Sequence, residues 1–399
     1  MATGSPSAYW LAMLPWLQVR SEVRIGDARF VHVDAAHPER SVPALEPVAK
    51  DCAQVLRSFR LSGASGIPAC TFLLPDGWDP TVYPDDAAQA KLYWAASLLM
   101  LSALSANEYG QHNAWCANAR TFQLNLVKFT SPPGYLPLTR RRRDRESLTI
   151  GAEWGDPLFH IPDECNPPMP VSVDKRLASS LGSLEDDDPL AQRLRLALPF
   201  FGWANTLADS SSWEMEIIAF VAALEALLGS NGQYTVAKAV RHLLQPYGSI
   251  RVRDARRTRP KITTRGGHAA QQEGWHVHGL LIHELYDIRN GLAHKGFCDT
   301  AELAWFPYEH LAMGAFLFPL LVKLLLARRG RYELTWDDKG ACDAVDPLLA
   351  APVWFDWRNP AYDGQAADTK WAAILLQETD ARHRREGIEL AKQVFRRET

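Results

Sequence analysis

The chain has 399 residues, which predicts two or three domains, and 47% of them are hydrophobic against 22% charged, as in a globular protein with a sizeable core. Fourteen Trp residues argue against disorder, and a net charge of -3 excludes a uniformly basic nucleic-acid binder, so any contact with RNA must come from local basic patches. The six Cys residues form no CxxC pair and no zinc-finger spacing, so we expect reduced thiols in a cytoplasmic protein without metal or cofactor. The N-terminal segment has no basic stretch before its apolar residues, so we expect no signal peptide.

Residues 1–183 predict a mixed α/β domain. Strand character appears at Phe72 to Trp78 and, with clear alternation, at Thr121 to Phe129. An Ala- and Leu-rich helix is expected between them, from Asp85 to Leu104, and Pro- and Gly-rich clusters mark loops. This part carries no catalytic motif, so we interpret it as a sensing or regulatory domain.

Residues 184–330 predict an α-helical bundle, which makes the whole chain α+β. Ser211 and Glu214 have the spacing of a capping box before one helix, and Gly229 suits its end. Another helix is expected to begin at the acidic EDDDP segment that starts at Glu185. Further helices are expected over Thr235 to Leu244, Trp275 to His294 and Thr300 to Arg328. Residues 331–399 are expected to form a loop-rich C-terminal extension that ends in an amphipathic helix over 369–397.

One apolar stretch, Leu311 to Ala327, has the composition of a membrane span. It is slightly short for a bilayer, and it contains Pro319 and Lys323. We therefore expect a buried helix of the bundle and no contact with a membrane.

The helix that ends at His294 carries the residues most suited to chemistry. At 100° per residue its apolar side chains form one stripe that we expect to face the core, namely Leu281, Leu285, Ile288 and Leu292. The opposite stripe is polar and consists of His283, Asp287, Asn290 and His294. Arg289 lies on the flank, and Gly291 is expected to loosen the helix so that Arg289 and His294 converge.

A histidine beside an arginine on an exposed helix is a plausible pair for cleaving a phosphodiester. Histidine titrates near neutral pH, so it can accept a proton from a ribose 2′-hydroxyl or donate one to a leaving oxygen. The planar guanidinium suits a phosphate whose charge grows in the transition state. On composition alone, a solvated polar face is the preferred interpretation.

The hexapeptide Arg289 to His294, RNGLAH, is an R-x4-H motif with a polar residue directly after the Arg. It resembles the signature of the HEPN superfamily, whose members are helical bundles. The flanking Leu285-Tyr286 and Lys295-Gly296 add to the likeness, and the upstream FVAALEALLG from Phe220 is similar to the Apea-like branch. The resemblance covers roughly Glu185 to Arg328.

The resemblance implies a metal-independent endoribonuclease of the defence or toxin type. It makes His294 the general acid or base, Arg289 the phosphate-stabilising group and Asn290 the residue that orients the site. Cleavage would leave a 2′,3′-cyclic phosphate and a 5′-hydroxyl. Because the chain has one R-x4-H motif, a homodimer through this helix would complete the site, under the control of an antitoxin or trigger protein. Gly296 stands where one branch carries a Tyr, which puts control by tyrosine nucleotidylation in doubt.

The basic loop before the motif helix, Arg251 to Arg265, is the preferred RNA-binding segment over the run at Arg140 to Arg145, which we interpret as a solvated loop. The residues expected to bind backbone phosphates are Arg256, Arg257, Arg259, Lys261 and, after the motif, Lys295.

Three further expectations concern side chains near the motif. Trp275 and Tyr286 could stack on unpaired bases, although core packing is an equal alternative. Glu225 could support Arg289 across the bundle. A metal site at His276, His278 and His283 is disfavoured, because an i, i+2 pair on a helix points two ways.

Two alternatives to an enzyme stay open. A catalytically silent HEPN module would bind RNA, a nucleotide or a protein partner without cleavage. A scaffold whose bundle only dimerises would tolerate changes at Arg289 and His294 but not in its apolar core.

Overall fold

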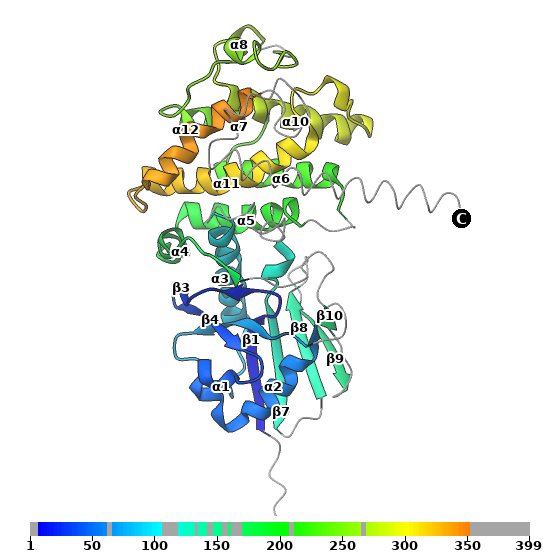
Figure 1. The fold of residues 1–399 in the computed structure, drawn as a ribbon, viewed down its shortest axis with the longest axis vertical. Coiled ribbons are helices and arrows are strands. Elements are labelled where there is room, and N and C mark those ends of the chain that lie inside the picture. Colours follow the sequence, from blue (N-terminus) through cyan, green and yellow to red (C-terminus); the bar gives the residue numbers. More distant parts are fainter. Residues whose placement is uncertain are drawn as a thin grey trace, which may run out of the picture. The chain divides into compact units, whose positions relative to one another are not determined.

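The computed structural model describes residues 7–61, 66–105, 119–131, 135–141, 147–153, 159–160, 170–206, 211–264 and 269–351. The chain divides into two compact units, residues 1–103 with 119–183, and residues 104–118 with 184–399 (Figure 1). The first unit contains an antiparallel sheet and the second is mostly helical, which confirms the expected α+β class in its coarse form.

The first unit is built on a seven-stranded sheet in the order β3-β4-β6-β1-β7-β8-β9, in which every neighbouring pair is antiparallel. The strands are β1 (Ser7–Leu14), β3 (Val23–Ile25), β4 (Ala28–Asp34), β6 (Ala69–Pro75), β7 (Asn125–Ser131), β8 (Tyr135–Arg141) and β9 (Ser147–Glu153). Two short parallel pairs join β2 (Gln18–Val19) to β11 (Pro170–Val171) and β5 (Phe59–Arg60) to β10 (Phe159–His160).

Both expected strands of this unit are present with shifted bounds. The one expected at 72–78 is β6, and the one expected at 121–129 begins only at Asn125, because Ala119–Phe122 forms a 3-10 turn. The expected helix is α3 (Asp86–Leu104).

A hydrophobic core joins the sheet to the helical segment that follows β4. That segment consists of α1 (Pro38–Ser41), a 3-10 turn (Pro43–Val48) and α2 (Ala49–Arg57). Its buried side chains, among them Leu45, Val55 and Leu56, share one cluster with sheet residues such as Leu11 and Phe72. On a different element, α4 (Lys175–Gly182) contacts β3 through paired glycines, since a Cβ on Gly182 would lie 2.2 Å from the nitrogen of Gly26.

The second unit contains the helices that carry the motif. They are α5 (Pro189–Ala204), α6 (Trp213–Leu228), α7 (Gln233–Leu244), α8 (Val252–Ala255), α9 (Ala269–Gln272), α10 (Val277–Lys295), α11 (Pro307–Arg328) and α12 (Trp336–Ala350). The helix cap lies one residue later than expected, because the hydroxyl of Ser212, not Ser211, accepts from the backbone N–H of Met215. Gly229 ends α6 in the left-handed conformation, at a φ of 62°, as the sequence predicts.

Two expectations about the end of this unit were wrong. The helix expected from Thr300 begins only at Pro307, after a 3-10 turn at Thr300–Glu302. The region after Gly330, expected to be loop-rich, contains α12, which starts at a capping box between Thr335 and Asp338 and packs on α10 and α11. The expected terminal helix over 369–397 lies outside the described residues.

The apolar helix α11 is the one stretch of the described chain that is long and apolar enough by itself to cross a membrane. Its window Glu309–Arg328 has a mean hydropathy of 1.9, and 89% of it is buried. The burial of α11 within the helical unit accounts for its apolar composition. This agrees with the buried helix expected from the sequence. The bent pair α6 and α7 passes the same test of length and composition only when both helices are taken together.

Candidate active site at the C-terminal end of α10

The three motif residues lie on the last turns of α10. Arg289 and Asn290 are half-buried, and His294 is exposed. The Arg289 Nη1 donates a hydrogen bond to the Asn290 Oδ1 at 3.0 Å. Gly296 ends the helix in the left-handed conformation, and its N–H donates to the Leu292 carbonyl at 3.1 Å. All three groups are therefore accessible to a ligand from solvent.

Glu225 of α6 holds the helix turn beneath Arg289 through another side chain. Its Oε1 accepts hydrogen bonds from the Tyr286 hydroxyl at 2.9 Å and from the Gly232 N–H at 3.3 Å. Burial and this carboxylate raise the pKa of Tyr286 well above its ordinary value, so the phenol stays a donor. Glu225 thus supports Tyr286 instead of pairing directly with Arg289, and the described residues show no hydrogen bond between that carboxylate and the guanidinium.

The turn between α6 and α7 is anchored to α10 by one amide that sequence reasoning missed. Gln233 Nε2 donates to the Asp287 Oδ1 at 2.6 Å and to the His283 carbonyl at 2.9 Å, and it lies 2.7 Å from the His283 Nδ1. His283, expected on the solvated stripe, is buried, whereas Leu292 of the expected core stripe is only half-buried. The packed side of α10 is therefore rotated toward His283.

Gly291 has a packing role that differs from the one expected. The helix continues through it, and a Cβ at this position would lie 3.1 Å from the Phe297 carbonyl oxygen. The chain folds back against α10 there, and the buried Glu284 accepts from the backbone N–H groups of Ala304 and Trp305 at 3.0 to 3.1 Å. Gly291 lets the returning segment approach, and Glu284 fixes its far end.

Arg259, expected to bind RNA, is part of the core. It is 5% exposed and forms an ion pair with Glu309, which is fully buried. Its Nε donates to the Ala304 carbonyl at 2.7 Å, and its Nη1 to the Ala351 carbonyl at 3.3 Å. A guanidinium so placed is not available to a backbone phosphate, so that expectation was wrong.

The remaining basic residues of the predicted RNA surface differ in how free they are. Arg256 is half-buried and donates to the Ile262 carbonyl at 2.8 Å and to Glu273 at 2.7 Å, so it mainly orders its own loop. Arg257, Lys261 and Lys295 are exposed. Lys261 also donates to a backbone carbonyl at 3.2 Å. Because these three side chains are exposed, they are available for contacts with phosphate.

The two aromatic residues proposed to stack on bases are core residues. Trp275 is 4% exposed and Tyr286 is 2% exposed. The Trp275 ring lies 4.3 Å from the Arg241 guanidinium carbon and 6.0 Å from the Tyr234 ring. The packing alternative is therefore correct for both.

Two of the three histidines near the start of α10 lie side by side, since the ring centroids of His276 and His278 are 5.5 Å apart. His278 Nδ1 lies 2.7 Å from the Asp346 Oδ1, while His283 is bound by Gln233. Asp346 also accepts hydrogen bonds from the backbone N–H groups of Ser249 and Ile250. Burial raises the pKa of Asp346, but His278 and these two bonds lower it by more, so the pKa lies below its ordinary value. Among the residues with a described placement, no group of three or more His, Cys, Asp or Glu side chains could hold a metal ion.

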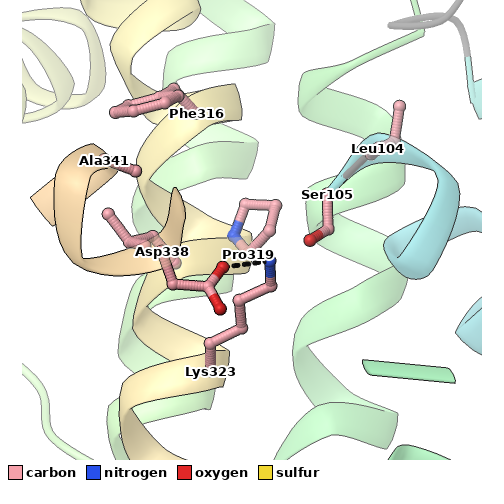
Figure 2. A pocket seen from close by; sticks show the side chains of 8 residues that line it. Leu104, Ser105, Phe316, Pro319, Lys323, Asp338 and Ala341 are labelled. Carbon is pink, nitrogen blue, oxygen red and sulfur yellow. Dashed lines mark hydrogen bonds and ion pairs between the residues drawn. The ribbon is translucent and has the colours of Figure 1, made fainter. Parts of the chain in front are cut away.

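A small pocket elsewhere in the helical unit holds a satisfied ion pair. Figure 2 shows Lys323 of α11 and Asp338 of α12 facing each other, with Nζ and Oδ1 2.6 Å apart, close to Pro319 and Ser105. Asp338 also accepts from the Tyr332 hydroxyl at 2.8 Å. Its charge is fully used in joining the two helices, so the pocket offers little for chemistry.

Comparison of the chain with protein-family models, with curated proteins and with solved structures gives no match. The geometry of the residues themselves is therefore the basis for a function.

Proposed function

We propose that this protein is a metal-independent endoribonuclease of the HEPN type that works in the cytoplasm as a dimer, as a defence or toxin effector. The observation that carries the proposal is the accessible Arg289, Asn290 and His294 group at the end of one helix. Arg289 uses one donor on Asn290, and no other hydrogen bond of its guanidinium is found within the described chain. Its remaining donors suit a phosphate.

The proposed reaction is an internal transesterification. His294 accepts the proton of a ribose 2′-hydroxyl while the 2′-oxygen attacks phosphorus, and the bond from phosphorus to the 5′-oxygen breaks. A second His294, on the partner subunit, donates a proton to that 5′-oxygen. Arg289 stabilises the negative charge that grows on the non-bridging oxygens. The products are a 2′,3′-cyclic phosphate and a 5′-hydroxyl.

Two features near the motif favour a paired arrangement. Phe297 is 63% exposed directly after the helix end, so an apolar side chain borders the polar group. Within one chain no described residue orients the His294 ring by a hydrogen bond, and a second copy would supply such a contact. Arg257, Lys261 and Lys295 would then bind flanking phosphates of the RNA.

The same lack of an orienting partner for His294 is what a silent binding module would also show. In that alternative, Arg289 and its neighbours bind RNA, a nucleotide or a protein without cleaving. The two functions differ in product, so one assay separates them.

The test is cleavage of end-labelled RNA by the purified full chain in EDTA. We expect cleavage with cyclic-phosphate ends, and a loss of about 100-fold or more in rate for His294→Ala and for Arg289→Ala. His242→Ala, which removes another exposed histidine of the helical unit, is the matched control and should cleave normally.

Cleavage that persists in both motif variants would contradict the proposed site. RNA binding without cleavage, by wild type and under conditions that dimerise the chain, would favour the silent module. Growth of cells that express wild type against His294→Ala tests the toxin role, because only the active form should arrest growth.

A further inference from the structure

A second group of basic side chains lies at the other end of α10. It consists of Arg241 of α7, Arg251 just before α8 and His276 at the N-cap of α10, and we refer to it as the N-terminal basic cluster. The α10 rise of about 1.5 Å per residue places it roughly 25 Å from His294 along the helix. The cluster is therefore distinct from the candidate active site.

Arg241 is held in place by two features of its surroundings. Its guanidinium carbon lies 4.3 Å from the centre of the Trp275 ring, a cation–π contact. Its stem crosses α10 at Gly279, where a Cβ would lie only 2.4 Å from the Arg241 Cδ. A glycine inside a helix is less stable than an alanine, so the helix gives up stability where this arginine crosses it.

Arg251 and His276 are fixed beside each other by the backbone. The two residues form an antiparallel bridge, with hydrogen bonds from Val252 N–H to the Trp275 carbonyl at 2.9 Å and from Val277 N–H to the Ile250 carbonyl at 3.0 Å. Side chains at such a bridge point to the same side. The His276 ring also packs on Gly248, where a Cβ would lie 2.5 Å from its Nδ1.

The cluster has no acidic partner among the residues that the structure describes. Asp346, the carboxylate whose charge acts on His276, is buried and bound by His278 and by the N–H groups of Ser249 and Ile250. Burial and the charge of Arg251 lower the pKa of Arg241, although Tyr234 opposes this. Arg251 donates one hydrogen bond to the Gly274 carbonyl and has other guanidinium donors left. The positive charges of Arg251 and Arg241 act on each other, and a bound anion would relieve this repulsion.

The position of the cluster at the start of α10 adds an electrostatic field that favours an anion. The N-terminal end of a helix carries partial positive charge, and α10 has 19 residues, enough for that charge to develop. Arg251 is exposed and Arg241 and His276 are half-buried, so an anion can reach all three from solvent. Two guanidinium groups and an imidazole offer donors that match the oxygens of a phosphate.

We propose that Arg241, Arg251 and His276 form a phosphate-binding site at the N-terminal end of α10. The phosphate belongs either to the backbone of a bound RNA or to a free phosphorylated small molecule, such as a nucleotide. The site binds whether or not the Arg289 and His294 pair cleaves RNA.

Two probes test the site on the full chain. The first is the thermal shift caused by inorganic phosphate and by adenosine monophosphate, measured against chloride at equal ionic strength. The second is binding of a fluorescent single-stranded RNA by His294→Ala protein at several salt concentrations. Each probe is applied to the parent, Arg241→Gln, Arg251→Gln and the control Arg253→Gln, which removes a 70%-exposed arginine close in sequence.

For the RNA backbone, we expect Arg241→Gln and Arg251→Gln to weaken binding several-fold. The slope of log affinity against log salt should fall by about 0.7 for one lost phosphate contact. For a small molecule, we expect both variants to abolish the thermal shift while the RNA slope stays unchanged. Arg253→Gln should behave as the parent in both assays.

Arg251→Gln keeps the test valid if Arg241→Gln folds poorly, because Arg251 is exposed. The proposal is wrong if neither probe distinguishes Arg251→Gln from Arg253→Gln. Cleavage of RNA by wild type is scored separately, so loss of this site and failure of the nuclease proposal give different results.

Discussion

Replacing Arg259 with Gln tests whether this residue is a buried structural group instead of an RNA contact. The change removes the ion pair to Glu309 and the hydrogen bond from Nε to the Ala304 carbonyl at 2.7 Å. Glu309 is 0% exposed, so the change would leave its buried carboxylate without the guanidinium that balances its charge. Breaking one side of such a pair costs about 3 to 5 kcal/mol.

For a helical unit of this size, each kcal/mol corresponds to about 2 to 4 °C in Tm, so we expect a fall of roughly 6 to 20 °C. The measurement is thermal unfolding followed by circular dichroism at 222 nm, a signal that helices dominate. Arg257→Gln, which changes an exposed arginine of the same loop, is the control and should shift Tm by less than about 2 °C.

The RNA assay completes the comparison. We expect Arg257→Gln to weaken RNA binding without loss of stability, and Arg259→Gln to lose stability first. If Arg259→Gln keeps its Tm and weakens RNA binding as much as Arg257→Gln, the buried ion pair is not the role of Arg259 and the argument from burial fails.

Three further changes give separate tests. Tyr286→Phe removes the hydrogen bond to Glu225 and should cost about 1 to 3 kcal/mol in chemical unfolding, while unchanged stability would exclude the bond. Gly291→Ala should lower RNA cleavage more than it lowers helix content, because a Cβ 3.1 Å from a backbone oxygen displaces the returning chain; equal activity would show that the segment adapts. Burial raises the pKa of Asp338, but Lys323 and Thr335 lower it by a larger amount, so its pKa in the folded state lies below that in the unfolded state. The charged Asp338 therefore stabilises the fold above its unfolded pKa, and this contribution is lost as the pH falls through the folded pKa. We expect Asp338→Asn to show a smaller loss of Tm than wild type below about pH 4. The same acid profile for both proteins would refute this.

Local patterns predicted the helices of the second unit well. The capping-box spacing at Ser211 and the helix stop at Gly229 placed α6 within a residue, because helix caps and a left-handed glycine are encoded by neighbouring residues. The helix that carries Arg289 and His294 was expected from Trp275 to His294 and runs from Val277 to Lys295. The missed α12 shows the limit, since Thr335 and Asp338 form a capping box whose second member is Asp, and its helix contains Gly and Pro.

Charge in a loop proved a poor guide to exposure. Arg256, Arg257 and Arg259 lie within four positions, yet one orders the loop, one is exposed and one is buried. The partner that draws Arg259 inward is Glu309, 50 residues away, and no local pattern indicates that contact. Gln233 likewise meets Asp287 across 54 residues.

The sequence by itself identified the arginine and histidine proposed to cleave a phosphodiester and indicated that they end a helix, because residue type and periodicity are local properties. Only the tertiary structure decided which charged groups stay in water. Desolvation depends on which distant segments pack together, and this packing buried Arg259 with Glu309, left Arg289 and His294 accessible and brought Arg251 close enough for its charge to act on Arg241.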